Sequence, residues 1–244
     1  MLKLKRSIHK TLKKYVWKIA IRWGVPVLEN DHREIIEGLK KYGFFESKSQ
    51  QKSIDQDGNP IPWFNYSAIE YLKQLDLSDR QIFEWGSGNS SLFFSDRCKS
   101  IISVEADKDW YELVKRNVRP NQQLIYCQTS DIAKSIDSYG KFDIIIIDSY
   151  MRYECGLRAI HHLKPGGLII LDNSDWYHET SKILRESANL IEVDMHGFGP
   201  INTYTTTTSF YFSRDFNFKP IAGRQPLYSR CAIVQTGKDD KIIN

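Results

Sequence analysis

The sequence predicts an α/β protein built on a doubly wound, mostly parallel sheet of seven strands, preceded by a helical extension. Apolar runs of strand length alternate with helical segments from Arg80 onward, which is typical of a parallel sheet. A turn with two glycines, Gly86 and Gly88, follows the first run. The last two runs lie too close together for a crossover helix, which indicates an antiparallel end to the sheet. A chain of 244 residues is long enough for one such domain with additional segments.

Seven segments account for the strands of this sheet. The first five are residues 81–85, 100–105, 123–127, 142–148 and 167–171. The other two, residues 190–195 and 209–213, are joined by a turn containing Gly197 and Gly199 and by a threonine-rich stretch. We expect these two strands to pair with each other in antiparallel orientation.

Basic residues are concentrated at the N-terminus. Residues 1–30 contain eight of the 34 Lys and Arg residues and one of the 30 acidic residues, and their apolar positions follow helical spacing. Such a helix suits an anionic membrane surface, contacted through residues 1–24. Docking on the main domain, or on a second subunit of a homo-oligomer, also explains the pattern. The rest of the chain is slightly acidic, which argues against nucleic acid as a partner.

Cysteine usage and hydropathy indicate a cytoplasmic protein. The four cysteines lie far apart, lack metal-ligand spacing and are not accompanied by the apolar region of a secretory signal, so we expect them to be reduced. No apolar stretch is long enough to span a bilayer. The protein is therefore expected in the cytoplasm, at the membrane face if residues 1–24 bind lipid.

The sequence pattern divides the chain into four parts. These are a basic amphipathic helix (1–30), a helical and lid segment (31–62), a cofactor-binding domain (63–218) and a C-terminal tail (219–244). The lid segment ends in a polar stretch, residues 47–62, with a strong turn signal at Asp57-Gly58. Three aromatic residues follow, which we interpret as core or cofactor-covering residues: Trp63, Phe64 and Tyr66.

The strand, glycine turn and helix start at residues 82–91 form a candidate nucleotide site. The glycines let the backbone approach a ligand closely, but Ser91 stands where a dinucleotide fingerprint places its third glycine. Glu84, near the strand end, suits a ligand with an ammonium group rather than a pyrophosphate. Glu105 ends the next strand, where a carboxylate can accept both hydroxyls of a ribose. Asp131 follows the third strand and suits either an adenine amino group or a helix N-cap.

The motifs of this region resemble those of the class I S-adenosylmethionine (SAM)-dependent methyltransferases. FEWGSGNSS is similar to the glycine motif of that superfamily, SVEAD to its ribose-binding strand, and FDIIIIDS with LKPGGLIILDN to its fourth and fifth strands. The resemblance spans residues 62–213 and implies a Rossmann-like methyltransferase fold with SAM as cofactor. It assigns cofactor binding to Glu84, Gly86, Gly88, Glu105 and Asp131. Ser87, in the glycine turn, and Asp148, after the fourth strand, are further candidates for cofactor binding.

Oxygen-bearing side chains gather at the predicted ends of the fourth and fifth strands. Asp148, Asp172 and Asn173 form a ligand set that suits Mg²⁺ and resembles the metal site of the metal-dependent O-methyltransferases. Alternatively, Asp148 acts as a metal-free base or faces the methionine end of the cofactor, while Asp172 and Asn173 cap strand and helix. His178 is a second candidate for a general base, with an ordinary surface histidine as the alternative.

These patterns predict a SAM-dependent methyltransferase that transfers a methyl group to a hydroxyl of a small molecule or glycan. Arg152 and Tyr153, just beyond Asp148, suit an anionic or sugar substrate, and a solvated helix start explains them equally well. One alternative is a nicotinamide-dependent oxidoreductase on a similar sheet, although Ser91, Glu84 and the antiparallel end of the sheet count against it. Another alternative is a noncatalytic protein recruited to membranes by residues 1–24.

Overall fold

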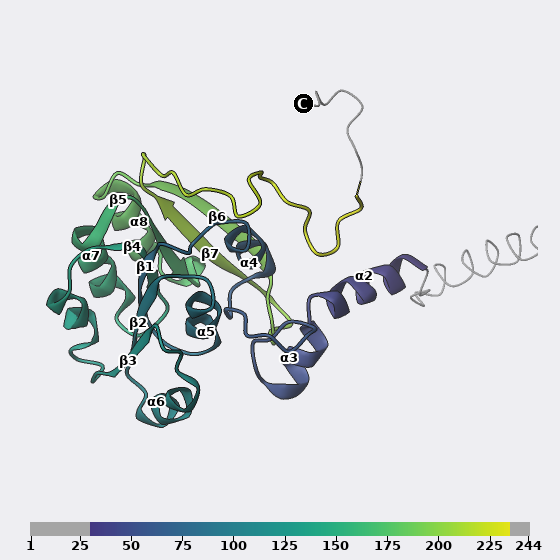
Figure 1. Ribbon diagram of the computed structural model, residues 1–244, viewed down its shortest axis with the longest axis horizontal. Coiled ribbons are helices and arrows are strands. Elements are labelled where there is room, and N and C mark those ends of the chain that lie inside the picture. The colour runs from purple at the N-terminus through teal and green to yellow at the C-terminus, as the bar shows by residue number, and fades with distance from the viewer. Residues whose placement is uncertain (1–29, 235–244) are drawn as a thin grey trace, which may run out of the picture. The chain divides into compact units, whose positions relative to one another are not determined.

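A computed structural model describes residues 30–234 of the chain (Figure 1). The chain divides into two units, Met1–Leu39 and Lys40–Asn244, which are described separately. Of the first unit, the structure describes only residues that belong to helix α2 (Asn30–Lys41). The predicted basic helix of residues 1–24 lies outside the described residues. No helix in the described part of the chain is long and apolar enough to cross a membrane.

The second unit is built on a sheet of seven strands, as the sequence predicts. In chain order the strands are β1 (Gln81–Trp85), β2 (Ser100–Glu105), β3 (Gln122–Tyr126), β4 (Phe142–Ile147), β5 (Leu163–Asp172), β6 (Ile191–Phe198) and β7 (Thr205–Phe212). Their order across the sheet is β3-β2-β1-β4-β5-β7-β6. The first five pair in parallel, whereas β7 runs antiparallel to both β5 and β6. The predicted antiparallel end of the sheet is therefore confirmed.

Helices cover both faces of this sheet (Figure 1). They are α3 (Phe44–Gln50), α4 (Tyr66–Leu72), α5 (Asn89–Ser95), α6 (Lys108–Val114), α7 (Arg152–His162) and α8 (His178–Glu186), with short 3₁₀ turns η1 (Lys115–Asn117), η2 (Ile132–Ser138) and η3 (Ser174–Trp176). Apolar residues of η2, α7 and α8 join the core on the face that carries Trp85 and Tyr211. Phe210 of β7 points to the opposite face of the sheet, where its ring contacts Tyr71 of α4. Burial on both faces explains why β4 is a nearly uninterrupted isoleucine run.

The structure corrects two predicted boundaries. The polar stretch 47–62 begins inside a helix, because α3 continues to Gln50. Gly43, with φ 79°, precedes this helix, and a side chain there would collide with the backbone of Asp55. Strand β5 starts at Leu163, four residues before the predicted run, because Lys164 to Gly167 continue the extended chain.

The C-terminal segment runs along α4 and the chain that follows it. Leu75 forms an isolated bridge with Pro220, and the Gln74 side chain accepts a hydrogen bond from the backbone of Leu227. Arg230 then contacts the loop after α3, where Nη2 lies 3.3 Å from Oδ2 of Asp57. The described part of this tail is therefore attached to the rest of its unit through individual contacts, while most of its residues are exposed.

Candidate functional site

The glycine turn lies where the strand order reverses between β1 and β4. Gly86 adopts φ 105°, and a Cβ at this position would lie 2.4 Å from the backbone oxygen of Asp148, the residue after β4. Only a glycine allows the two strand ends to approach so closely. The carboxyl ends of β1 and β4 thus open onto the position where doubly wound sheets bind ligands.

Glu105 connects this turn to the end of β2. Its Oε2 accepts a hydrogen bond of 2.8 Å from the Ser87 hydroxyl, and its Oε1 accepts from the backbone N–H groups of Ala106 and Asp107. Trp110 of α6 donates its indole N–H to the backbone oxygen of Ser87 at 2.8 Å. The predicted ribose-binding carboxylate is therefore fixed in orientation beside the turn.

Glu84 is buried beneath the turn. Its carboxyl group accepts hydrogen bonds from the hydroxyls of Ser90, Ser91 and Ser103, the last at 2.8 Å. Burial raises the pKa of Glu84 to about 7, although the three hydroxyls oppose this shift. All these partners belong to the protein, so the contact between Glu84 and a ligand ammonium group stays a prediction.

Two adjoining cavities lie at these strand ends. The first, here called the turn cavity, has a volume of about 140 Å³ and is bounded by the glycine turn, Trp110 and residues 51–53. The second, the aromatic cavity, has a volume of about 280 Å³. It is lined by Trp63, Asp148, Asp172, Asn173, Trp176, Asn202 and Tyr204. Asp148 and Trp63 line both cavities and therefore mark their boundary.

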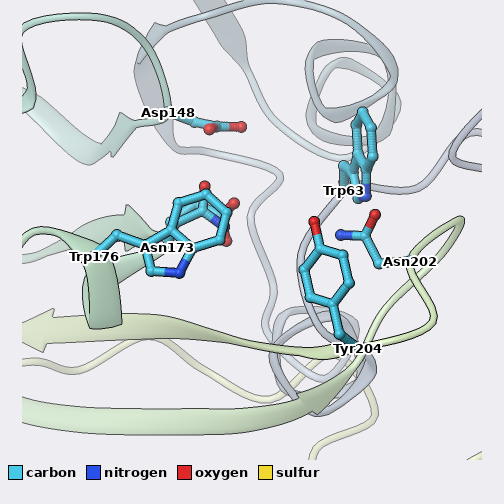
Figure 2. Close-up of a pocket in the computed structure, with 7 residues that line it drawn as sticks. Trp63, Asp148, Asn173, Trp176, Asn202 and Tyr204 are labelled. Atoms are coloured by element: carbon cyan, nitrogen blue, oxygen red, sulfur yellow. The ribbon is translucent and has the colours of Figure 1, made fainter.

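The aromatic cavity combines flat aromatic side chains with oxygen and amide groups. Figure 2 shows Trp63, Asn202 and Tyr204 on one side, facing Asp148, Asn173 and Trp176 on the other. The side chain of Trp176 is 59% exposed, so this wall is accessible to a ligand. A polar ring with apolar faces would match such a surface.

The segment before Trp63 covers the turn cavity from the lid side. Asn89, the first residue of α5, donates a hydrogen bond of 2.6 Å from Nδ2 to the backbone oxygen of Ser53. The Ser53 hydroxyl in turn donates to the backbone oxygen of Pro62 at 2.9 Å. These bonds hold residues 51–53 against the glycine turn.

Asp172 and Asp148 are two carboxyl groups on the wall of one cavity, held differently. Asp172 is buried at the end of β5 and accepts a hydrogen bond of 2.6 Å from the Thr208 hydroxyl. Burial, followed by repulsion from Asp148, raises the pKa of Asp172 well above its usual range. Burial also raises the pKa of Asp148, but the guanidinium of Arg152, 2.8 Å away, opposes that shift. The Arg152 guanidinium therefore favours the ionised form of Asp148.

Comparison with known proteins supports the fold read from this geometry. No protein-family model matches the sequence, and no curated protein matches it. Among solved structures, precorrin-6y C5,15-methyltransferase from Geobacter metallireducens GS-15 is similar, with a TM-score of 0.51 and 15% identity over 60% of this chain and 86% of that chain. A protein assigned as an O-methyltransferase from Klebsiella pneumoniae gives a TM-score of 0.50 and 18% identity over 61% and 77%. This chain has the class I methyltransferase fold.

Within this methyltransferase fold, the sequence-predicted residues fall into two groups. Ser87, Gly88 and Asp148 line the turn cavity, with Gly86 and Glu105 directly beside it. Asp148, Asp172 and Asn173 line the aromatic cavity. The structure thus brings most of the predicted residues to one edge of the sheet.

Two predicted site residues lie elsewhere. Asp131 is exposed beyond β3, where its carboxylate lies 3.8 Å from the Lys134 ammonium group, and it makes no N-cap hydrogen bond to η2. His178 is exposed at the start of α8 and lines a separate hollow together with Tyr153 and Trp176. The adenine contact of Asp131 and the base role of His178 stay predictions.

The Arg152 guanidinium lies within the predicted Mg²⁺ site. Nη2 of Arg152 lies 2.8 Å from Oδ1 of Asp148 and 3.3 Å from Oδ1 of Asn173, so a guanidinium occupies the place between two of the predicted ligands. Within residues 30–234, no group of three or more His, Cys, Asp or Glu side chains is arranged to hold a metal ion. The oxygen atoms at these strand ends therefore do not fit a divalent cation.

Several cavity residues were not predicted from the sequence. They are Trp110 of α6, Trp176 of η3, and Asn202 and Tyr204 of the connection between β6 and β7, which only the fold brings together. The contact between Arg152 and Asp148 did have a local signal, since an acid and an arginine four residues apart are neighbours on a helical turn.

Proposed function

We propose that this chain is a SAM-dependent methyltransferase that transfers a methyl group to a hydroxyl of a small molecule or glycan. The observation that carries the proposal is the pair of cavities that meet at Asp148 and Trp63. One cavity abuts the glycine turn of a methyltransferase fold, which suits the methyl donor. The other carries carboxyl, amide and aromatic groups, which suit a polar acceptor.

The donor side offers groups that match SAM. The carboxylate of Glu105 is already oriented by two backbone N–H groups, so a ribose hydroxyl needs only to join or replace Ser87 at Oε2. The exposed indole of Trp110 adds an aromatic surface at the same cavity. Because the Glu105 carboxylate is oriented before the ribose binds, little entropy is lost on binding, which favours affinity.

In this proposal, Asp148 receives the proton of the acceptor. When bound, SAM would supply an activated methyl group, which the acceptor oxygen would take as the carbon–sulfur bond breaks and its electron pair returns to sulfur. The hydroxyl proton passes to the Asp148 carboxylate at the boundary of the two cavities. Asn173, Asn202 and Tyr204 would hold other polar groups of the acceptor and align its hydroxyl with the methyl group.

Calorimetric titration of the full chain with SAM, S-adenosylhomocysteine and NAD tests the donor part of this proposal. We expect micromolar binding of SAM or S-adenosylhomocysteine, weakened in Glu105→Ala. Binding of NAD alone would instead favour the oxidoreductase. Failure of all three ligands to bind would favour a noncatalytic binding protein.

Radiolabelled SAM and a panel of phenols, sugars and amines then test the acceptor part. We expect label to pass to a hydroxyl compound and the Asp148→Asn variant to reduce kcat by about a hundredfold or more, with SAM affinity little changed. Transfer to amines alone would refute hydroxyl methylation while leaving the donor part intact.

We also propose that residues 1–24 bind an anionic membrane surface, since their basic residues would be attracted to acidic headgroups. The full chain should cosediment with phosphatidylglycerol vesicles, less so as salt is added, and a chain lacking residues 1–24 should not. Equal binding by the shortened chain would refute this assignment.

A further inference from the structure

We propose that the guanidinium of Arg152 is the permanent cation of this site, standing where a divalent metal ion would otherwise bind. The inference rests on the proposed function, because it places Arg152 behind the acceptor cavity of a methyltransferase. Arg152 is then a positioning residue for Asp148, and methyl transfer requires no metal ion.

A single nitrogen atom carries the central observation. Nη2 of Arg152 contacts Oδ1 of Asp148 at 2.8 Å and Oδ1 of Asn173 at 3.3 Å. These oxygens come from the ends of two adjacent strands, β4 and β5, and both line the aromatic cavity. A cation bridging the same two oxygens would have to share the position of Nη2.

The other terminal nitrogen, Nη1, is also held by hydrogen bonds, whereas the buried Nε has no partner among the described residues. Nη1 donates to the backbone oxygen of Ser149 and, at 3.1 Å, to the hydroxyl of Tyr177. The guanidinium carbon also lies 4.4 Å from the centre of the Tyr177 ring, within the range of a cation–π contact. With its side chain only 11% exposed, Arg152 has little freedom to leave the position.

The backbone directs both ends of this contact. Met151, directly before Arg152, has φ 54°, and Asn173 has φ 55°, a left-handed conformation that most residues avoid. Such backbone angles persist where surrounding contacts require them. Here they occur at Asn173 itself and directly before Arg152, the two residues whose side chains meet.

The position excludes a second cation for two reasons. Mg²⁺ and Mn²⁺ need several oxygen ligands at short, regular distances, whereas the guanidinium already takes one oxygen each from Asp148 and Asn173. Its positive charge also repels a metal ion at close range. Removing the charge while keeping the oxygens should therefore open a metal site that the natural protein lacks.

Manganese binding to the full chain tests this inference, because electron paramagnetic resonance of free Mn²⁺ reports binding directly. We expect chelator-treated wild-type protein to bind Mn²⁺ weakly or not at all. Arg152→Gln, which removes the charge but keeps much of the side chain, should bind Mn²⁺ at least about tenfold more tightly. Arg152→Lys keeps a charge at the site and should resemble wild type.

Two further variants make the result specific. Arg158→Gln removes another arginine of α7, paired with Asp137 outside the site, and should bind no more Mn²⁺ than wild type. Adding Asp148→Asn to Arg152→Gln should abolish the new metal binding. Circular dichroism confirms that each variant is folded, and Arg152→Ala replaces any glutamine variant that is not.

Two outcomes would overturn the inference. Wild-type protein could bind Mn²⁺ tightly and lose it in Asp148→Asn, or the folded Arg152→Gln and Arg152→Ala variants could bind Mn²⁺ no better than wild type. SAM titration of the same samples distinguishes failure of this inference from failure of the proposed methyltransferase function. The expected Mn²⁺ pattern without SAM binding would support the cation role and refute the methyltransferase.

Discussion

The Ser87 hydroxyl donates a hydrogen bond to Glu105, joining the glycine turn after β1 to the end of β2. Because Oε1 of the same carboxylate accepts two backbone N–H groups, the turn and the neighbouring strand end are held in one arrangement. The proposed donor site is thus organised before a ligand arrives, and preorganisation of this kind reduces the entropy lost on binding.

Glu105 should therefore matter more to cofactor affinity than Ser87. Glu105→Gln removes the charge from a hydrogen bond to ribose, and we expect SAM affinity to fall by about tenfold or more. Ser87→Ala should cost less, because the backbone N–H groups still orient the carboxylate. Calorimetric titration measures the SAM affinity of both variants, and Glu112→Gln, on the surface of α6, serves as the control. Equal affinity in wild type and Glu105→Gln would contradict the assignment.

Gly86 should be intolerant of any side chain. Gly86→Ala combines a positive φ with a Cβ only 2.4 Å from the Asp148 backbone oxygen, so we expect the free energy of unfolding to fall by about 3 kcal/mol or more. Gly140→Ala is the matched control, since no atom lies within 4 Å of its Cβ position and its φ is not positive. Urea denaturation measures the free energy of unfolding of both variants. Similar decreases for Gly86→Ala and Gly140→Ala would contradict the prediction.

Glu84 should make stability depend on pH. Its pKa is about 7 in the folded protein and close to 4.5 when unfolded, so the folded state keeps a proton that the unfolded state releases. The stabilisation linked to this proton is complete below pH 4.5 and is lost as pH rises through 7. A shift of this size corresponds to about 3 kcal/mol. Urea denaturation of wild type and Glu84→Gln between pH 5 and 8 isolates this effect. If the free energy of unfolding changes equally with pH in both proteins, Glu84 is not the cause.

Trp63 and Trp176 should affect the two ligands differently. Trp176 lines the aromatic cavity but not the turn cavity, so Trp176→Ala should raise the acceptor KM by about tenfold with little change in SAM affinity. Trp63 lines both cavities, and Trp63→Ala should weaken both ligands. Initial rates and SAM calorimetry provide the two readouts. Equal loss of SAM affinity in both variants would mean that the cavities do not separate donor from acceptor.

Much of the fold could be predicted because it depends on local patterns. The buried run of β4 and the glycine turn after β1 are continuous in sequence, and burial on both faces makes such strands uniformly apolar. The end of α3 was harder to predict, since its last turn, Ser47 to Gln50, is polar and is typical of a loop. Tertiary packing of Phe44 and Ser47, both buried, maintains this helix.

The candidate site was predicted less completely because its contacts are long-range. Sequence identified Asp148, Asp172 and Asn173 as neighbours but could not show that Arg152 would stand between two of them. The facing wall comes from the segments that carry Trp63 and Tyr204, far from Asp148 in sequence. Side chains that come together only because of the order of strands in the sheet leave no periodic pattern in the sequence.

The indole of Trp110, bonded to the glycine turn, gives the protein an optical reporter. It is 47% exposed on the wall of the turn cavity, whereas Trp85 is fully buried in the core. A ligand that enters the cavity would displace water from Trp110, and from Trp63 on the same cavity, and change their fluorescence, while the emission of Trp85 stays constant. Donor occupancy can therefore be followed in real time, before any acceptor has been identified.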